Sequence, residues 1–235
     1  MSAVSQVKRL GGLTLELLFP KTCLGCGKAG QLLCARCRRS LPRIFPPVCP
    51  KCGRPQASGV LCPSCVRWNS SIDGIRAPFR FGGTIREAVH QFKYKNLRIL
   101  ARPLAELMCE YLESHRLPAD VVVPVPLHPK RLRERGYNQS ELLARELGKL
   151  VKLPVIAGEL VRRRYTLPQA RTASVAEREA NMVDAFACLG NSMEGRQVMI
   201  IDDVSTSAAT LDSCAAALKS AGAASVWGLV LAREV

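Results

Sequence analysis

The sequence lacks any apolar run near the roughly 20 residues that a membrane-spanning helix needs. Near its start, Lys8 and Arg9 interrupt the hydrophobic residues, so we find no secretory signal core. No Gly-x-x-x-x-Gly-Lys-Ser/Thr motif occurs, which argues against a P-loop nucleotide site. Aromatic residues make up only 5% of the chain, which favours a parallel sheet packed by aliphatic side chains. We therefore expect a cytoplasmic α/β protein, with peripheral contact at the inner face of the membrane as an alternative location.

Positive charge is abundant and unevenly distributed. The chain of 235 residues has a net charge of +15, and residues 1–68 hold 11 Lys and Arg against a single acid. This length allows one sizeable α/β core and a small appended module. The basic first third favours a polyanionic partner, such as nucleic acid or an anionic membrane surface. A basic surface that serves only solubility fits the charge equally well.

We expect three parts along the chain. Residues 1–20 should form an N-terminal helix, because Val4, Val7, Leu10 and Leu13 fall on one side, and we expect it to dock onto the body. Residues 21–68 form a cysteine-rich module. A change of composition at Asn69-Ser70-Ser71 then marks the start of an α/β domain over residues 70–235.

The cysteine-rich module predicts two metal sites. Eight of the eleven cysteines form Cys-x-x-Cys pairs, namely Cys23/Cys26, Cys34/Cys37, Cys49/Cys52 and Cys62/Cys65. Each pair presents two sulfurs to one tetrahedral ion, so two pairs complete a Cys₄ zinc site. Glycine follows both Cys26 and Cys52, and this internal repeat favours pairing within each half, although a crossed pairing stays open. We expect a double zinc ribbon that holds two structural Zn²⁺ ions and depends on them for its shape.

The ribbons have a structural role by default, but a second role is equally compatible with their sequence. Basic residues alternate there with Phe45 and Trp68, a pattern that suits single-stranded nucleic acid because cations bind the backbone and rings stack on bases. These basic residues are Arg36, Arg38, Arg39, Arg43, Lys51, Arg54 and Arg67.

The α/β domain reads as alternating strands and helices. Pro78 places the first strand at a sheet edge, since proline cannot donate to a ladder. Expected strands cover residues 72–81, 120–126, 184–188, 198–201 and 225–232, and expected helices cover 84–93, 97–115, 138–150 and the stretch after Thr210.

One strand end in this domain predicts a phosphate site. Four apolar residues, 198–201, precede two acids and a run of small hydroxylated residues, so a buried strand should open into a tight loop before a helix capped by Thr206 or Ser207. Free N–H groups and the helix dipole favour an anion there. The acids can accept hydrogen bonds from sugar hydroxyls or hold a hydrated Mg²⁺. The expected phosphoribosyl-binding residues are Asp202, Asp203, Val204, Ser205, Thr206, Ser207, Ala208, Ala209 and Thr210.

This loop resembles the ribose-5-phosphate loop of type I phosphoribosyltransferases, Asp-Asp-Val-x-Thr-Thr-Gly-x-Thr. The match holds at Asp202, Asp203, Val204, Thr206 and Thr210. Ala208 departs from it by standing at the usual glycine position. A methyl group there would crowd a phosphate or a backbone of positive φ.

A second cluster of candidate residues follows the strand at 120–126. Residues 127–136 should form a cationic loop on the same rim as the two acids, because the carboxyl ends of parallel strands share one edge. Asn138 can cap the next helix, a role that alone accounts for it. We expect this region to bind pyrophosphate or DNA through His128, Lys130, Arg131, Arg135, Tyr137 and Asn138.

Several motifs in fixed order resemble the competence protein ComF family, also called ComFC or GntX-like. They are Pro124-Val-Pro126, Arg135-Gly-Tyr-Asn-Gln139, the segments 166–178 and 181–186, and the Asp-Asp loop, all preceded by the cysteine module. The similarity extends from Cys23 to Ala232. It implies a double zinc ribbon joined to a type I phosphoribosyltransferase-like parallel sheet flanked by helices. The basic stretch from Arg162 to Ser174 is similar to the hood that covers the family's pocket.

The resemblance also implies a function. A ComF-type protein handles incoming single-stranded DNA in natural transformation, beside a DNA-uptake helicase and a recombination mediator, and has a phosphoribosyl-binding pocket. One alternative is an active Mg²⁺-dependent transferase that uses phosphoribosyl pyrophosphate, although no residue stands out to bind its acceptor base. The other is a zinc-ribbon scaffold without a working pocket.

Overall fold

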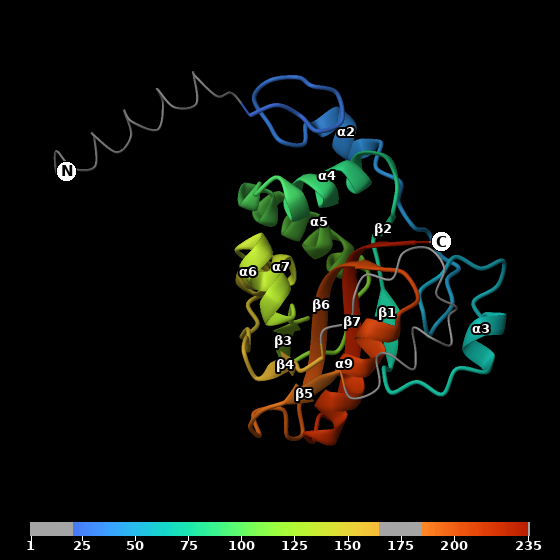
Figure 1. The fold of residues 1–235 in the computed structure, drawn as a ribbon. Coiled ribbons are helices and arrows are strands. Elements are labelled where there is room, and N and C mark those ends of the chain that lie inside the picture. Colours follow the sequence, from blue (N-terminus) through green and yellow to red (C-terminus); the bar gives the residue numbers. More distant parts are fainter. Residues whose placement is uncertain (1–20, 165–184, 235) are drawn as a thin grey trace.

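A parallel sheet forms the centre of the computed structural model, which describes residues 21–164 and 185–234 (Figure 1). The helix expected in residues 1–20 and the motif segments at 166–178 and 181–184 lie outside the described residues. Every pair of strands in this sheet is parallel. The strand order is β1 (Gly74–Arg76), β7 (Ser225–Arg233), β6 (Gln197–Ser205) and β3 (Val121–Pro124), and β2 (Phe79–Arg80) also pairs with β7.

Helices cover both faces of the sheet, which explains why residues 198–201 of β6 and 226–232 of β7 are apolar. On one face, Met199 and Ile201 pack with α4, α5 and α7. On the other, Val198 and Ile200 pack with α9 and a small antiparallel pair, β4 and β5. The bounds are α4 (Gly83–Tyr94), η1 (Arg98–Leu100), α5 (Ala101–Ser114), α6 (Pro129–Arg135), α7 (Gln139–Val151), β4 (Leu160–Arg162), β5 (Phe186–Cys188) and α9 (Ala209–Ser220).

Two local expectations were wrong. The stretch 127–136 contains the short helix α6, with Pro129 at its first position and Gly136 ending it at a φ of 77°. Proline at the first turn loses no hydrogen bond, and glycine adopts positive φ at little cost, so the sequence supports a helix there. The N-cap of α9 is Ala208, and no side chain caps this helix. The reason is that β6 continues to Ser205, so Thr206 and Ser207 form the turn that precedes the helix.

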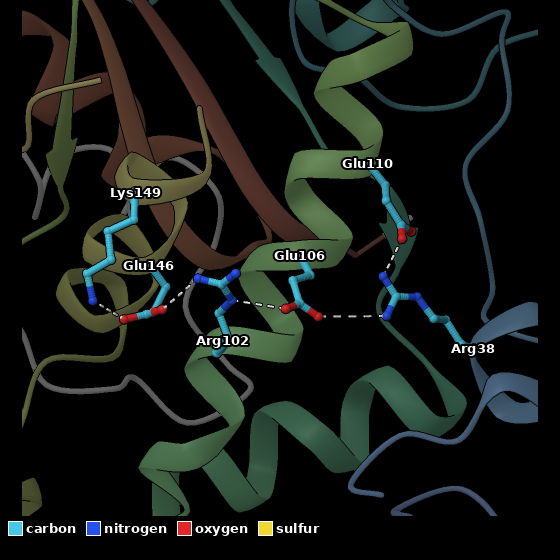
Figure 2. Close-up of polar contacts among 6 residues, drawn as sticks. All are labelled: Arg38, Arg102, Glu106, Glu110, Glu146 and Lys149. Carbon is cyan, nitrogen blue, oxygen red and sulfur yellow. Dashed lines mark hydrogen bonds and ion pairs between the residues drawn. The ribbon is translucent and has the colours of Figure 1, made fainter. Parts of the chain in front are cut away.

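The first half of the ribbon module, which contains α2 (Ala35–Arg39), lies against α5. Arg38 contacts the carboxylates of Glu106 and Glu110, and Figure 2 shows that the charges continue across α5 to α7. Arg102 forms ion pairs with Glu106 at 2.9 Å and with Glu146 at 3.5 Å. Glu146 also forms an ion pair with Lys149 at 2.5 Å, which ends the network. Each exposed ion pair adds little alone, but charges connected in a network contribute more than isolated pairs.

The second half of the ribbon module, which contains α3 (Pro63–Val66), covers the exposed edge of β1. The N–H of Ile75 donates to the carbonyl of Lys51 at 2.7 Å. Gly53 has a φ of 70°, and a Cβ there would lie 2.4 Å from the carbonyl oxygen of Ile75. Only glycine therefore permits this close approach. The zinc ribbon thus blocks a sheet edge that could otherwise pair with another chain.

Candidate functional site

Eight cysteines gather into two groups of four, in which the sulfur atoms lie within 4.8 Å of one another. The first group is Cys23, Cys26, Cys34 and Cys37, and the second is Cys49, Cys52, Cys62 and Cys65. The pairing within each half of the repeat is therefore confirmed, and the crossed pairing is wrong. Four cysteine sulfurs at this spacing suit a tetrahedral Zn²⁺ ion.

Backbone N–H groups prepare these cysteines to bind metal. The N–H of Cys34 donates to Sγ of Cys23, and the N–H of Cys62 donates to Sγ of Cys49, both at 3.4 Å. Burial alone would raise the pKa of Cys23 and Cys49, but such N–H donors outweigh it and lower both values to about 6. The donor set therefore fits zinc, which binds the thiolate form.

The two acids at the tip of β6 have different partners. Asp203 is buried and forms an ion pair with Lys93 of α4, with 2.8 Å between Nζ and Oδ1. Asp202 instead accepts hydrogen bonds from Oγ of Ser140 at 2.7 Å and from the N–H of Asp203 at 2.9 Å. Helices α4 and α7 both pack on the face of the sheet that Met199 and Ile201 line, so the two acids join the tip of β6 to two helices of that face.

This arrangement divides the charge at the strand tip unequally. Burial, reinforced by the charge of Asp203, raises the pKa of Asp202 to about 6. Burial alone would lower the pKa of Lys93, but the carboxylate of Asp203 outweighs it and raises that pKa. Asp203 is therefore held as a neutralised ion pair. Asp202 is the carboxylate to which a Mg²⁺ ion or a sugar hydroxyl could add a contact.

The loop after the acids has one strained backbone position, directly before the N-terminus of α9. Ala208 is buried and adopts a φ of 69°, in the left-handed region that favours glycine. Helix α9 begins at the next residue, and its first N–H groups have no partners within the helix. These N–H groups could bind a phosphate. The methyl group of Ala208, however, stands where the type I phosphoribosyltransferase motif has glycine.

Helix α6 carries most of the cationic residues expected in this region, and His128 precedes it. Nδ1 of His128 accepts from the N–H of Lys130 at 3.2 Å and so caps this helix. Burial and several nearby cations, with Arg162 of β4 first among them, lower the pKa of His128. His128 is therefore neutral at pH 7, and the positive charge of this rim comes from the lysine and arginine side chains.

The other residues expected there hold the start of α7 in place. Nη1 of Arg135 donates to Oε1 of Gln139 at 2.5 Å, and the hydroxyl of Tyr137 donates to the carbonyl of Phe92. The side chain of Asn138 accepts from the N–H of Ser140 at 3.1 Å and donates to the carbonyl of Val125 at 2.9 Å. These bonds fix the end of α7 that carries Ser140 to Asp202.

Sequence reasoning missed Lys93 and Ser140. The sequence did contain a hint that Lys93 points inward. It lies four residues after the buried Val89 and therefore on the same face of α4, which packs on the core. A lysine in that position needs a buried partner. Ser140 carried no such signal, since its contact with Asp202 joins residues 62 positions apart.

The fold and its sites define a class of protein, a double zinc ribbon joined to an α/β domain built on a parallel sheet. The double zinc ribbon domain family matches residues 14–66 of the chain. The chain is 22% identical to the glutamine phosphoribosylpyrophosphate amidotransferase of Bacillus subtilis, with a TM-score of 0.39 over 55% of this chain and 26% of that one. It is 14% identical to a purine phosphoribosyltransferase from Pyrococcus horikoshii, with a TM-score of 0.36 over 57% and 82% of the two chains.

Curated relatives match nearly the whole chain. It is 29% identical to competence protein ComFC of Bacillus subtilis over 88% of this chain and 86% of the relative. It is 30% identical to competence protein F of Haemophilus influenzae, over 85% and 90% of the two chains. The DNA utilization protein YhgH of Escherichia coli is also 30% identical, over 86% and 91%. The chain belongs to the competence protein ComF family.

Proposed function

We propose that this protein handles incoming single-stranded DNA in natural transformation and holds a phosphoribosyl group at the tip of β6. The observation that carries the proposal is the loop 202–210, in which two acids precede the N-terminus of α9, within a chain whose relatives are named competence proteins. The backbone from Ser205 to Thr210 would bind the phosphate, and the acids would bind the ribose hydroxyls. The α6 rim would bind pyrophosphate or DNA.

The proposed pocket includes a Mg²⁺ ion but no catalytic turnover. Asp202 is the carboxylate without an ion-pair partner among the described residues, so it would hold a hydrated Mg²⁺ shared with a phosphate. We propose ligand binding rather than transfer, because the buried Ala208 methyl group occupies the cradle position at which the transferase motif has glycine.

The proposed contact with single-stranded DNA uses the exposed cations of the ribbons. Arg36, Arg39 and Arg67 are exposed, whereas Arg38 is bound to two glutamates. We propose a cytoplasmic location and an association with a DNA-uptake helicase and a recombination mediator. Among the described residues, every helix is too short or too polar to cross a bilayer.

Calorimetric titration with phosphoribosyl pyrophosphate and Mg²⁺ tests the pocket. Asp202→Asn should weaken binding at least tenfold, since it removes the charge that would face the metal, while zinc content stays at two ions per chain. Glu113→Gln, an exposed change on α5, is the matched control and should leave binding unchanged. Equal affinity in the wild type and Asp202→Asn would reject the pocket.

A transformation assay tests the biological role. A clean deletion of the gene should lower transformation frequency, and the Asp202→Asn variant separates the pocket's share of that loss. Normal transformation after deletion would reject the competence role.

A further inference from the structure

A cleft lies between the second half of the ribbon module and α9, and no residue of α6 lines it. Its volume is about 1090 Å³, and it reaches the strand-tip loop only at Ser207 and Ala209. Arg54, Arg67 and Trp68 line it from the ribbon, Ser213 and Ala217 from α9, and Arg233 from the end of β7.

The cleft contains buried donors that have no acceptor. Arg233 is 2% exposed, and its Nη1 donates to Oγ of Ser205 at 3.3 Å. Within the described part of the chain, Nε of Arg233 and Nε of Arg54 have no hydrogen-bond partner. An unsatisfied buried N–H is costly, so its retention points to a ligand that supplies an oxygen.

The charges around these donors favour an anion. Three arginines line the cleft, whereas the lining acid, Asp212, already accepts from the N–H of Ile72 at 3.0 Å. Cys52, Cys62 and Cys65 offset part of the charge of Arg233 electrostatically. These cysteines accept no hydrogen bond from Nε of Arg233, however. The third arginine, Arg67, is exposed.

The remaining walls suit a flat ring. Trp68 is half-buried and presents an aromatic group, while the facing surface of α9 consists of small residues such as Ser213, Ala216 and Ala217. Guanidinium groups bind phosphate oxygens in paired geometry, and an aromatic side chain stacks on a base of any identity. A volume of this order accommodates a nucleotide.

We propose that this cleft binds a nucleotide, with the phosphate on Arg54 and Arg233 and the base on Trp68. The cleft adjoins the strand-tip loop at Ser207 and Ala209, but the proposal does not rest on phosphoribosyl binding there. The nucleotide could be free in solution or one unit of a single strand, since both present the same phosphate and base.

Tryptophan fluorescence of the full-length, zinc-loaded protein tests the proposal. The chain has two tryptophans, so Trp227→Phe leaves Trp68 as the sole reporter. Thymidine monophosphate and a short oligothymidylate should each be titrated, with inorganic phosphate as a third probe. We expect saturable quenching by a thymidine ligand and little by phosphate alone. Saturation by the monophosphate identifies a free-nucleotide site, and saturation by the oligomer alone identifies a strand-binding site.

Matched arginine variants decide whether the cleft is responsible. Arg54→Gln and Arg67→Gln should each weaken the quenching titration about tenfold, the effect expected for loss of a charged hydrogen bond. Arg116→Gln removes the same charge from an exposed position just after α5 and should change the affinity less than twofold. These variants avoid the buried Arg233, whose replacement endangers folding.

The outcomes separate this proposal from the proposed function. Quenching should persist in Asp202→Asn, even if that variant no longer binds phosphoribosyl pyrophosphate. Absence of quenching by every probe would overturn the proposal. So would equal losses in Arg54→Gln and Arg116→Gln, because overall charge would then explain binding.

Discussion

Lys93 and Asp203 form an ion pair 2.8 Å long that joins helix α4 to the tip of β6. The pair neutralises one of the two adjacent acids from inside the protein. Ser140 binds the other acid without adding charge. Burial raises the pKa of Asp202 to about 6, which places its charge change close to physiological pH.

Replacing Lys93 should destabilise the fold. Lys93→Met leaves the buried carboxylate of Asp203 without its cation, so we expect a loss of about 2–3 kcal/mol in unfolding free energy. Urea denaturation measures this loss. Lys95→Met, an exposed change at the end of the same helix, should cost less than about 0.5 kcal/mol. Recovery of stability in Lys93→Met with Asp203→Asn would confirm the pairing, and equal losses in the two lysine variants would contradict it.

Asp202 should make stability fall as pH rises from about 4 to 6. Its pKa rises from 3.8 to about 6 on folding, so over this interval the native state binds more protons than the unfolded state. The contribution of the group is therefore full below pH 4 and lost above pH 6, and amounts to at most about 3 kcal/mol. Asp202→Asn should flatten this part of the profile in urea titrations at several pH values. A profile unchanged by the substitution would show that the carboxyl group titrates normally.

The sequence predicted what depends on local pattern. The apolar runs placed β6 and β7, and the cysteine spacing predicted both metal sites and favoured the pairing that the structure has. It did not predict contacts between distant segments. The hydrogen bond from Ile75 to Lys51 and the contact of Ser140 with Asp202 depend on tertiary packing. One error was local: we expected Thr206 or Ser207 to cap α9, but the N-cap is Ala208. The reason is that β6 extends past the two acids instead of ending at them.

Loss of zinc from the second site should destabilise the α/β domain more than loss from the first. The second half of the ribbon module bonds directly to β1, whereas the first contacts α5 through partly exposed ion pairs and packs only partly buried leucines against the core. Cys52→Ser should therefore lower the melting temperature of the whole chain, and Cys26→Ser should lower it by less. Circular dichroism melting together with zinc analysis measures both effects. If each variant holds one zinc ion and both melt at the same temperature, the edge-covering role of the second half is wrong.

Single-stranded DNA binding should weaken steeply with salt, and exposed arginines should determine the slope. Each phosphate contact contributes a slope of about −0.7 in a plot of log affinity against log salt. Arg39→Gln should reduce the slope by about that amount, while Arg38→Gln should reduce it less, because Glu106 and Glu110 already bind Arg38 (Figure 2). Fluorescence anisotropy at several salt concentrations provides the slopes. A salt-independent affinity in the wild type would remove the electrostatic basis of DNA binding.

Substituting glycine for Ala208 should improve both stability and phosphate binding. Ala208 has a φ of 69°, where an L-residue is strained by about 1 kcal/mol relative to glycine, so Ala208→Gly should raise the melting temperature. Ala217→Gly in the middle of α9 is the matched control and should cost about 1 kcal/mol. Removal of the methyl group also opens the cradle, and calorimetry should show tighter binding of phosphoribosyl pyrophosphate. If Ala208→Gly destabilises the protein as much as the control and leaves ligand affinity unchanged, the loop does not cradle a phosphate.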